Sequence, residues 1–466
     1  MGSFLRRKNG VKSGLPAGVK SGVPGVPGGI PGGVNHQILR LAIPNIVSNL
    51  SVPLLGLVDT ALMGRLENVA YLGALAIGSM VFNFLYWGFG FLRMGTTGLT
   101  AQEFGAERRE GMVMILVRVL FLAGLIGILM VLLKVPVVAV AFRFMDAGPE
   151  VTGFAQEYVD IRIFTAPAMM MLFGLQGWFL GMQNATFPMI ITIVHNVLNI
   201  VLNLLFIQGF GMKVDGVAYG TLISTWLAFF LALGLFFWRY RGLMGDIRWD
   251  RFFLPEALLR YFSVNRDIFI RTLCLIFTFT FFTAMSARQG ELVLAANTIL
   301  LQLWLVASYG IDGFAYAAES LVGRYLGGRD DGRLQGVIRR VILWGVGLGA
   351  AISVVYGIFG RGILEIFTGN AEVIALAMSV IVWTVLAPAV SGLSYVLDGV
   401  FIGATRTGVM RNTMLIATLL VFLPVYWIGT ELVGVHGLWL AMLMFMLARG
   451  VSLAWFVKGI RVRGSG

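Results

Sequence analysis

The sequence predicts an all-α polytopic membrane protein with twelve transmembrane helices, and three observations carry that prediction. Of its 466 residues, 58% are hydrophobic and 12% are charged, and the mean hydropathy is +0.86. Many apolar runs exceed the roughly 18 residues that cross a bilayer. The second half of the chain also repeats features of the first. So few charges would not cover the surface of a soluble protein of this size, so the helices are expected to face lipid.

The apolar runs define the expected helices. We place them at residues 38–63, 71–97, 111–133, 153–181, 187–208, 215–239, 264–287, 292–322, 335–359, 372–403, 410–430 and 434–457. This arrangement puts 25 basic residues on the face that holds the N-terminus. The other face receives seven, which are Arg65, Lys134, Arg143, Arg162, Lys213, Arg288 and Arg361. Cytoplasmic faces carry the excess of Lys and Arg, so we expect a multi-pass protein of the plasma (inner) membrane with both termini cytoplasmic.

The net charge, the cysteine and histidine positions and the motifs argue against several classes of function. The net charge of +12 follows from the positive-inside pattern, so no nucleic-acid partner is predicted. Cys274 has no second cysteine to pair with, and His36, His195 and His436 are too scattered for a metal site, so we predict neither a metal nor a cofactor. The chain lacks HExxH, a GxSxG on a helix and a Gly-rich phosphate loop, which argues against an enzyme.

An internal duplication organises the chain. A shift of 222 residues places 63–77 on 285–299 and Gly105 on Gly327, and it aligns GWFLG (177–181) with GVFIG (399–403). We therefore predict a disordered basic tail at 1–37, an N-lobe at 38–240, a cytoplasmic linker at 241–262, a C-lobe at 263–459 and a basic C-terminal tail at 460–466. Parallel six-helix halves around a central cavity are an arrangement used for alternating access.

Asp59 is the most informative residue. It lies in the first apolar helix, with no other charge between Arg40 and Arg65. A carboxylate at membrane depth costs several kcal/mol and marks a functional site by default. Such an acid can bind and release a proton or a metal cation as its surroundings alternate between wet and dry. This is how a secondary transporter couples two fluxes, although a purely structural role is the alternative.

A row of amides marks the fifth helix. Asn199 and Asn203 are four residues apart, and Asn196 lies three before Asn199, so all three share one face. Amides inside an apolar helix must face protein or water rather than lipid. They either build a polar site or only bond neighbouring helices.

Six segments resemble the multidrug and toxic compound extrusion (MATE) family, specifically its DinF branch. They occur in family order and cover essentially all of residues 38–458. The segments are RLAIPNIVSNLSVPLLGLVDTALMGRL (40–66), FLRMGTTGLTAQEFGA (91–106), NRDIFIRT (265–272), LAANTILLQ (294–302), DGFAYAAESLVGRYLG (312–327) and LDGVFIGATRT (397–407). The resemblance implies a two-lobed antiporter that expels organic cations, often aromatic, in exchange for protons or sodium.

The resemblance also implies residue roles. The coupling carboxylate of the first helix corresponds to Asp59, the proline that bends this helix corresponds to Pro44, and the surrounding polar cluster corresponds to Asn199, Asn203 and Thr221. An aspartate is common in the family where this chain has Asn203. An amide supplies no negative charge for a bare cation, and hard cations prefer several carboxylate oxygens. We therefore expect protons, with sodium as the alternative.

Other charges lie inside the predicted helices. Asp267 and Arg271, four apart, are expected to form an intrahelical pair. Arg93 is expected to extend toward the cytoplasmic surface, and the alternative is that it neutralises one of the acids inside the helices. Asp398 resembles the tenth-helix aspartate that the NorM branch uses for sodium. The secondary candidates for coupling, besides Asn196, are Asp312, Glu319 and Asp398.

The leading hypothesis is a proton-coupled exporter of hydrophobic organic cations. Its rivals are a sodium-coupled exporter and a lipid-linked precursor flippase of the related superfamily. A flippase would need several basic residues in its cavity, whereas we expect mostly acidic charges there. The expected partners are small organic cations, protons or sodium, and membrane lipids, and the expected state is a monomer.

Overall fold

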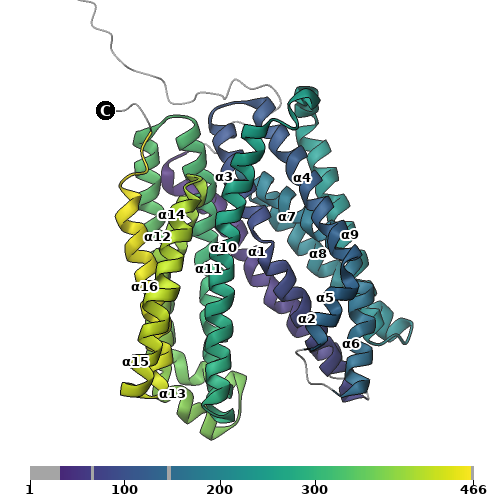
Figure 1. Cartoon of the computed structure of the whole chain (residues 1–466), viewed down its shortest axis with the longest axis vertical. Helices are drawn as coiled ribbons and strands as arrows, with labels where there is room; N and C mark the ends of the chain where they lie inside the picture. Colours follow the sequence, from purple (N-terminus) through teal and green to yellow (C-terminus); the bar gives the residue numbers. More distant parts are fainter. Residues whose placement is uncertain (1–31, 64–67, 144–147, 463–466) are drawn as a thin grey trace, which may run out of the picture.

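The computed structural model describes residues 32–63, 68–143 and 148–462. Within these ranges every regular element is helical, and twelve helical spans are long and apolar enough to cross a membrane, which confirms the predicted fold class (Figure 1). Most of the predicted N-terminal tail, at residues 1–31, lies outside the described residues, as do residues 463–466 of the C-terminal tail. The first helix begins at Val34, inside the stretch expected to be tail.

Six spans make up the first half of the chain. They are α1 (Val34–Met63), α2 (Val69–Gly88) with α3 (Phe91–Gly105), α4 (Arg109–Leu132), α6 (Pro149–Arg162) with η1 (Ile163–Thr165) and α7 (Ala166–Gly181), α8 (Thr186–Leu204) with η2 (Leu205–Gly209), and α9 (Val214–Tyr240). A short helix, α5 (Lys134–Arg143), precedes α6. The second and fourth spans each contain a break, at Phe89–Gly90 and at η1, so neither is one continuous helix.

Six further spans make up the second half. They are α10 (Pro255–Arg288), α11 (Glu291–Gly327), α12 (Asp331–Phe367), α13 (Ala371–Gly403), α14 (Thr407–Ile416) with η5 (Ala417–Phe422) and α15 (Leu423–Val433), and α16 (Val435–Val457). The connection between halves holds η3 (Arg241–Asp246) and η4 (Trp249–Arg251). Proline suits the first turn of a helix, and Pro255 starts α10 within the stretch predicted as linker.

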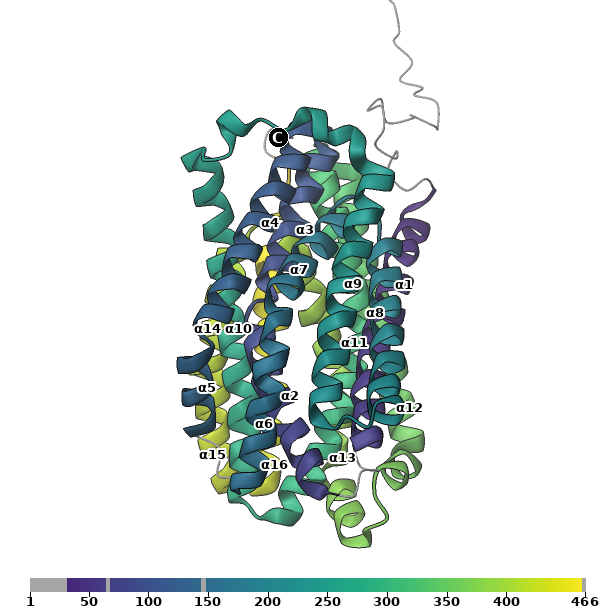
Figure 2. The ribbon, with the colours of Figure 1, turned by 90° about the vertical axis from the view of Figure 1, so that its right-hand side faces the viewer.

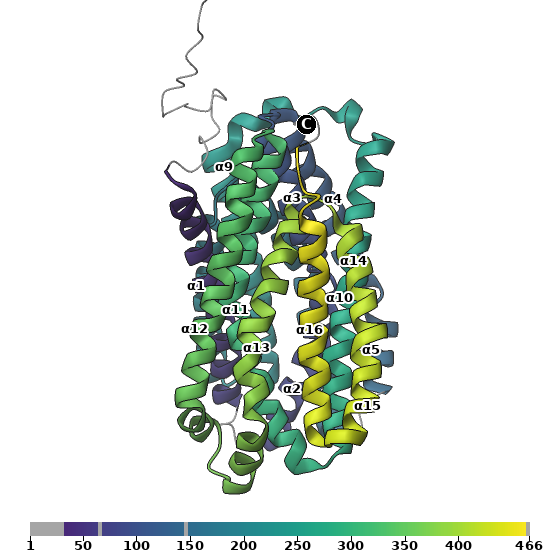
Figure 3. The ribbon, with the colours of Figure 1, turned by 90° about the vertical axis from the view of Figure 1, so that its left-hand side faces the viewer.

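The two halves pack as two bundles with separate apolar cores. One core is built from the first half around Trp178 and Phe179, and the other from the second half around Trp304 and Trp439. A third cluster, which contains Leu41 and Ile460, joins the halves near the end where the described chain stops at Val462, and we call this end the basic end. Figure 1 shows the helices of the two bundles diverging away from this end, and Figures 2 and 3 show each bundle from its own side.

The seam at the basic end repeats the sequence duplication. A Cβ on Gly105 would lie 1.9 Å from the carbonyl oxygen of Arg324, and a Cβ on Gly327 would lie 2.0 Å from that of Gln102. The offset of 222 residues that pairs Gly105 with Gly327 also pairs Gln102 with Arg324. The two contacts are therefore equivalent across a pseudo-two-fold axis, and only glycine permits this backbone approach. The contacts reproduce the predicted duplication.

Helix α1 contacts both bundles. It packs on α11, where Asn49 Nδ2 donates to the carbonyl oxygen of Tyr309 at 3.1 Å. It also packs on α8, where Asn196 Nδ2 donates to Ser51 Oγ at 2.9 Å. In Figure 1 this purple helix runs obliquely from one bundle toward the other. A movement of one bundle against the other must therefore act on α1.

Candidate functional site

The structure brings Asp59, Asn203, Asn199 and Thr221 together in the N-terminal bundle. Asn203 Nδ2 donates to Asp59 Oδ1 at 2.7 Å and to Asn199 Oδ1 at 2.9 Å. Asn199 Nδ2 in turn donates to Thr221 Oγ1 at 3.0 Å. A hydrogen-bonded chain therefore runs from the carboxylate on α1 through α8 to α9. We call these four residues the N-lobe cluster.

Local sequence explains why the amides fit there. Asn199 and Asn203 lie one turn apart on α8, which has an apolar opposite face, and both are buried. Gly220 on α9 makes room for the second amide, because a Cβ at that position would lie 1.9 Å from Asn203 Oδ1. The expectation that the amide row faces protein is confirmed.

The N-lobe cluster suits an acid that changes its protonation state. Asp59 is half-buried and forms no ion pair with any residue in the described ranges. Asn203 donates to its carboxylate, while the buried Oδ1 of the same amide has no hydrogen-bond partner among the described residues. An amide carries both a donor and an acceptor. It can therefore bond the ionised acid through Nδ2 and the protonated acid through Oδ1.

Arg162 on α6 faces this region, whereas the sequence predicts it on the membrane face opposite the N-terminus. It lies thirteen residues after Pro149, which starts α6, or about 20 Å along the helix at 1.5 Å per residue. Its guanidinium donates to Tyr158 and lies 4.7 Å from the centre of the Phe82 ring. It is within electrostatic reach of Asp59 without forming an ion pair with it. Its position inside the predicted helix at 153–181 could have indicated from the sequence that this arginine lies within the membrane.

The two remaining N-terminal candidates are placed differently. Asn196 bonds Ser51 on α1 rather than the acid, so it joins helices, as the structural alternative proposed. Pro44 lies inside α1, which the structure describes as one helix, and Asn45 Nδ2 donates to the carbonyl oxygen of Leu41 at 2.7 Å nearby.

Asp398 occupies a buried charge cluster in the C-terminal bundle. Its Oδ2 accepts from Arg271 and from Arg449 Nη2, the latter at 2.5 Å. The predicted pair between Asp267 and Arg271 is wrong, because Asp267 instead contacts Arg411 at 2.8 Å and Arg266 at 3.2 Å. Asp267, Arg271 and Asp398 are all buried, so burial does not choose the partner; the arrangement of α10 and α13 places Asp398 within hydrogen-bonding distance of Arg271. The tertiary partner of Arg271 therefore prevails over its helical neighbour.

Glu319 pairs across the two bundles. Arg93 on α3 lies 3.2 Å from the Glu319 carboxylate on α11, and its guanidinium lies 3.9 Å from the centre of the Tyr316 ring. The expectation that Arg93 extends to the membrane surface is therefore wrong, and the alternative, that it neutralises one of the acids inside the helices, is confirmed. The contact links the N-terminal and C-terminal bundles directly.

Asp312, also on α11, differs from both acids. It is half-buried, and no hydrogen bond or ion pair joins it to another described residue. Arg271 and Arg93 are within electrostatic reach.

Arg449, which completes the cluster around Asp398, was missed by sequence reasoning, although it is a single charge in the apolar run 434–457.

The expected excess of acids inside the membrane spans is not found. Four arginines accompany the four candidate acids there: Arg93, Arg162, Arg271 and Arg449. The balance of charge therefore gives no argument against a flippase. Within the described ranges no group of three His, Cys, Asp or Glu residues could hold a metal ion.

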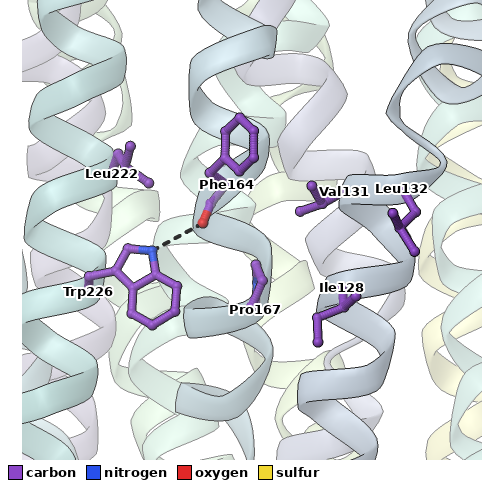
Figure 4. A pocket seen from close by; sticks show the side chains of 7 residues that line it. All are labelled: Ile128, Val131, Leu132, Phe164, Pro167, Leu222 and Trp226. Atoms are coloured by element: carbon purple, nitrogen blue, oxygen red, sulfur yellow. Dashed lines mark hydrogen bonds between the residues drawn. The ribbon is translucent and has the colours of Figure 1, made fainter.

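An apolar hollow lies apart from these acids, between α4, α7 and α9 (Figure 4). Its volume is about 380 Å³, and its lining residues are Ile128, Val131, Leu132, Phe164, Pro167, Leu222 and Trp226. Trp226 Nε1 donates to the carbonyl oxygen of Phe164 at 3.1 Å, which leaves an apolar surface. Ile128, Leu132 and Phe164 are exposed on the outside of the bundle. None of its described lining residues is titratable.

Comparison with known proteins agrees with the fold and the duplication. The family model MatE matches residues 44–205 and again 268–428. The chain is 38% identical to DNA damage-inducible protein F of Escherichia coli (strain K12), over 89% of this chain and 90% of that protein. It is 28% identical to Protein DETOXIFICATION 44, chloroplastic, of Arabidopsis thaliana, over 91% of this chain and 82% of the relative.

A solved structure shows the same fold. It is described as the outward-facing conformation of a multidrug resistance MATE family transporter of the MOP superfamily, and it superposes with a TM-score of 0.82 at 21% identity, covering 92% of this chain and 96% of that one. Two matches to one family model, one in each half, and extended identity to a DinF protein establish the relationship. The chain belongs to the MATE family, in its DinF branch.

Proposed function

We propose that this protein is a proton-coupled antiporter that exports hydrophobic, often aromatic, organic cations by alternating access, with Asp59 as the coupling acid. The hydrogen bond of 2.7 Å between Asn203 and Asp59 carries this proposal, because it ties a half-buried acid to a neutral amide. No arginine holds the charge of Asp59 fixed within the described residues. Proton and cargo cation compete for one carboxylate, so loading of either releases the other.

Helix α1 connects this exchange to movement. Asp59 lies on the part of α1 that contacts α8, while Asn49 holds another part to α11. Pro44 has no amide hydrogen, which lowers the cost of bending a helix there. A change in the bond between Asp59 and Asn203 therefore acts on a helix that both bundles share.

Sodium coupling is the second candidate. Asp59 is the one carboxylate in the N-lobe cluster, and the other oxygens come from amides and a hydroxyl. Hard cations prefer sites with several carboxylate oxygens, so the cluster fits a proton better. Asp312 and Glu319 are secondary coupling candidates. The carboxylate of Asp398 already binds two guanidinium groups, so we do not assign it a coupling role.

We also propose an orientation of the protein in the membrane. The basic end faces the cytoplasm, by the positive-inside pattern, in an inner or plasma membrane. Each monomer works alone, with lipid around both bundles. A lipid-linked precursor flippase receives less support, because both halves of the chain match the MatE model.

The test uses everted membrane vesicles with a preset proton gradient. Addition of a cationic dye should discharge the gradient in wild-type vesicles. Asp59→Asn should abolish the discharge, because an amide does not carry a proton at neutral pH. Asp250→Asn, an exposed acid of η4, is the matched control and should transport normally.

The same vesicles separate the two ions. A sodium gradient at matched pH should not drive dye movement. Full activity of Asp59→Asn would remove the coupling assignment, and full activity with sodium alone would reverse the choice of ion.

A further inference from the structure

Two guanidinium groups converge on one carboxylate in the C-terminal bundle. Arg271 on α10 and Arg449 on α16 both donate to Oδ2 of Asp398 on α13. Their side chains are 8% and 1% exposed, and that of Asp398 is 6% exposed. The local charge is therefore one positive unit in excess. We call these three residues the arginine cluster.

Each of the two guanidinium groups has an N–H donor without an acceptor in the described part of the chain. The Nε atoms of Arg271 and Arg449 are buried and have no partner among the described residues. An uncompensated buried charge costs several kcal/mol. A group that brings a negative charge close to these two guanidiniums would therefore stabilise them.

Asp312 on α11 is a further acid within electrostatic reach of Arg271. It forms no hydrogen bond or ion pair with Arg271 or with any other described residue. Asp312 is half-buried whereas the arginine cluster is buried, so a ligand would approach from the side of Asp312. The charged and titratable groups around Asp312 come from four helices and are Arg271, Arg93, Asp398, Glu319, Tyr309, Tyr316 and Tyr395.

Arg93 and Arg271 differ as possible ligand sites. Arg93 already has its own carboxylate, Glu319, and an aromatic ring beneath it. Arg271 shares Asp398 with Arg449, so it can give up that contact while Asp398 remains paired. A guanidinium presents several donors in one plane and matches the two oxygens of a carboxylate.

We propose that Arg271 is an anion-accepting subsite for a carboxylate carried by the cargo, and that Asp312 takes up a proton from solvent when this carboxylate binds. After binding, the cargo carboxylate pairs with Arg271, Asp398 keeps Arg449, and neutral Asp312 no longer contributes a charge. The inference deepens the proposed function, on which it rests. The preferred cargo is an aromatic cation that also carries a carboxylate, with its positive end directed to Asp59.

A matched pair of probes tests this subsite. Rhodamine 110 carries a delocalised cation and a free carboxylate, and rhodamine 123 is its methyl ester. Binding of each to the purified full-length protein is measured by fluorescence anisotropy. Wild-type protein should bind rhodamine 110 about tenfold more tightly than the ester, the gain expected from one charge-assisted pair. Arg271→Gln should bring the ratio of the two dissociation constants to one.

Proton uptake gives a second, independent readout. Both dyes displace the same proton from Asp59, so the difference between them isolates the C-terminal bundle. Rhodamine 110 should take up about one proton more than the ester, as measured with a pH indicator in weak buffer. Asp312→Asn should remove this difference while it keeps or increases the preference for rhodamine 110.

Control variants keep the test decisive. Arg411→Gln removes another arginine of the C-terminal bundle, one paired with Asp267, and should leave the tenfold preference intact. If Arg271→Gln does not yield folded protein by gel filtration, Arg271→Lys should retain the preference, and Asp312→Asn decides the question. A wild-type ratio of one, or an unchanged ratio in Arg271→Gln, overturns the subsite. If efflux of the ester by wild-type protein and by Asp59→Asn is the same, the proposed function is refuted instead.

Discussion

Asp59 and Asp398 are both acids inside membrane spans, but their partners differ in charge. Asp59 accepts from a neutral amide, Asn203, and has no ion pair in the described part of the chain. Asp398 accepts from two arginines. A carboxylate bonded to amides can lose its charge without breaking an ion pair, whereas loss of the charge between two guanidiniums would leave both of them without their partner. Depth in the membrane alone therefore does not identify a coupling acid.

Glu319 is the intermediate case. It has one arginine partner, Arg93, which also contacts the Tyr316 ring. The three acids therefore form a series with no, one and two arginine partners. If the charge of the partners sets the roles of these acids, neutralising the acid should lower the free energy of unfolding least at Asp59, more at Glu319 and most at Asp398.

The largest effect is expected at the end of the series with two arginines. Asp398→Asn keeps the side-chain shape but leaves Arg271 and Arg449 without their carboxylate. The free energy of unfolding should fall by about 3–5 kcal/mol, the range for breaking a buried ion pair from one side. Unfolding in mixed micelles by added dodecyl sulfate measures this difference.

Two variants serve as controls for that measurement. Asp59→Asn should change the unfolding free energy by less than about 1 kcal/mol, since it strands no charge. The double variant Arg271→Gln, Asp398→Asn removes one positive charge as well and should regain part of the loss. An equal loss in Asp59→Asn and Asp398→Asn would show that the charge of the partners does not distinguish the two acids.

Glu319→Gln should have the next largest effect. Its loss should be about 3 kcal/mol, the lower end of the range for breaking a buried ion pair from one side. It should be smaller than that of Asp398→Asn, because one arginine rather than two loses its partner and Arg93 keeps its contact with Tyr316. The same unfolding assay checks the order. A loss larger than that of Asp398→Asn would show that partner number does not rank these sites.

Much of this arrangement was predictable from the sequence. The twelve spans follow from hydropathy, and the offset of 222 residues found in the chain reappears in the paired contacts of Gly105 and Gly327. The position of Asp59 among the amides was predicted partly from the period of α8 and partly from family resemblance. These features depend on local composition and period, which a sequence displays directly.

The arginine partners were not predictable in the same way. Spacing of four residues favoured Asp267 for Arg271, yet a carboxylate on α13 pairs with it instead. Arg93 was expected at the surface but contacts a helix of the other bundle. Such pairs join residues more than a hundred positions apart, and their geometry is set by how helices pack. Arg449 could have been noticed as a charge in an apolar run, but its partner could not.

The smallest effect is expected at the end of the series without arginine, where a neutral partner is removed. Asn203→Ala leaves Asp59 without its amide donor and separates it from Asn199 and Thr221. A hydrogen bond to a charged group contributes about 1.5 kcal/mol, so dye-driven discharge of the proton gradient should slow roughly tenfold without being abolished. Initial rates in everted vesicles measure it, with Asn196→Ala as the matched amide that bonds Ser51 instead. Equal slowing in both variants would mean that the amide row supports helix packing and does not assist the acid. Slowing confined to Asn203→Ala would show that a neutral partner, acting on a carboxylate free to change its charge, is what distinguishes the N-terminal acid from its counterparts in the other bundle.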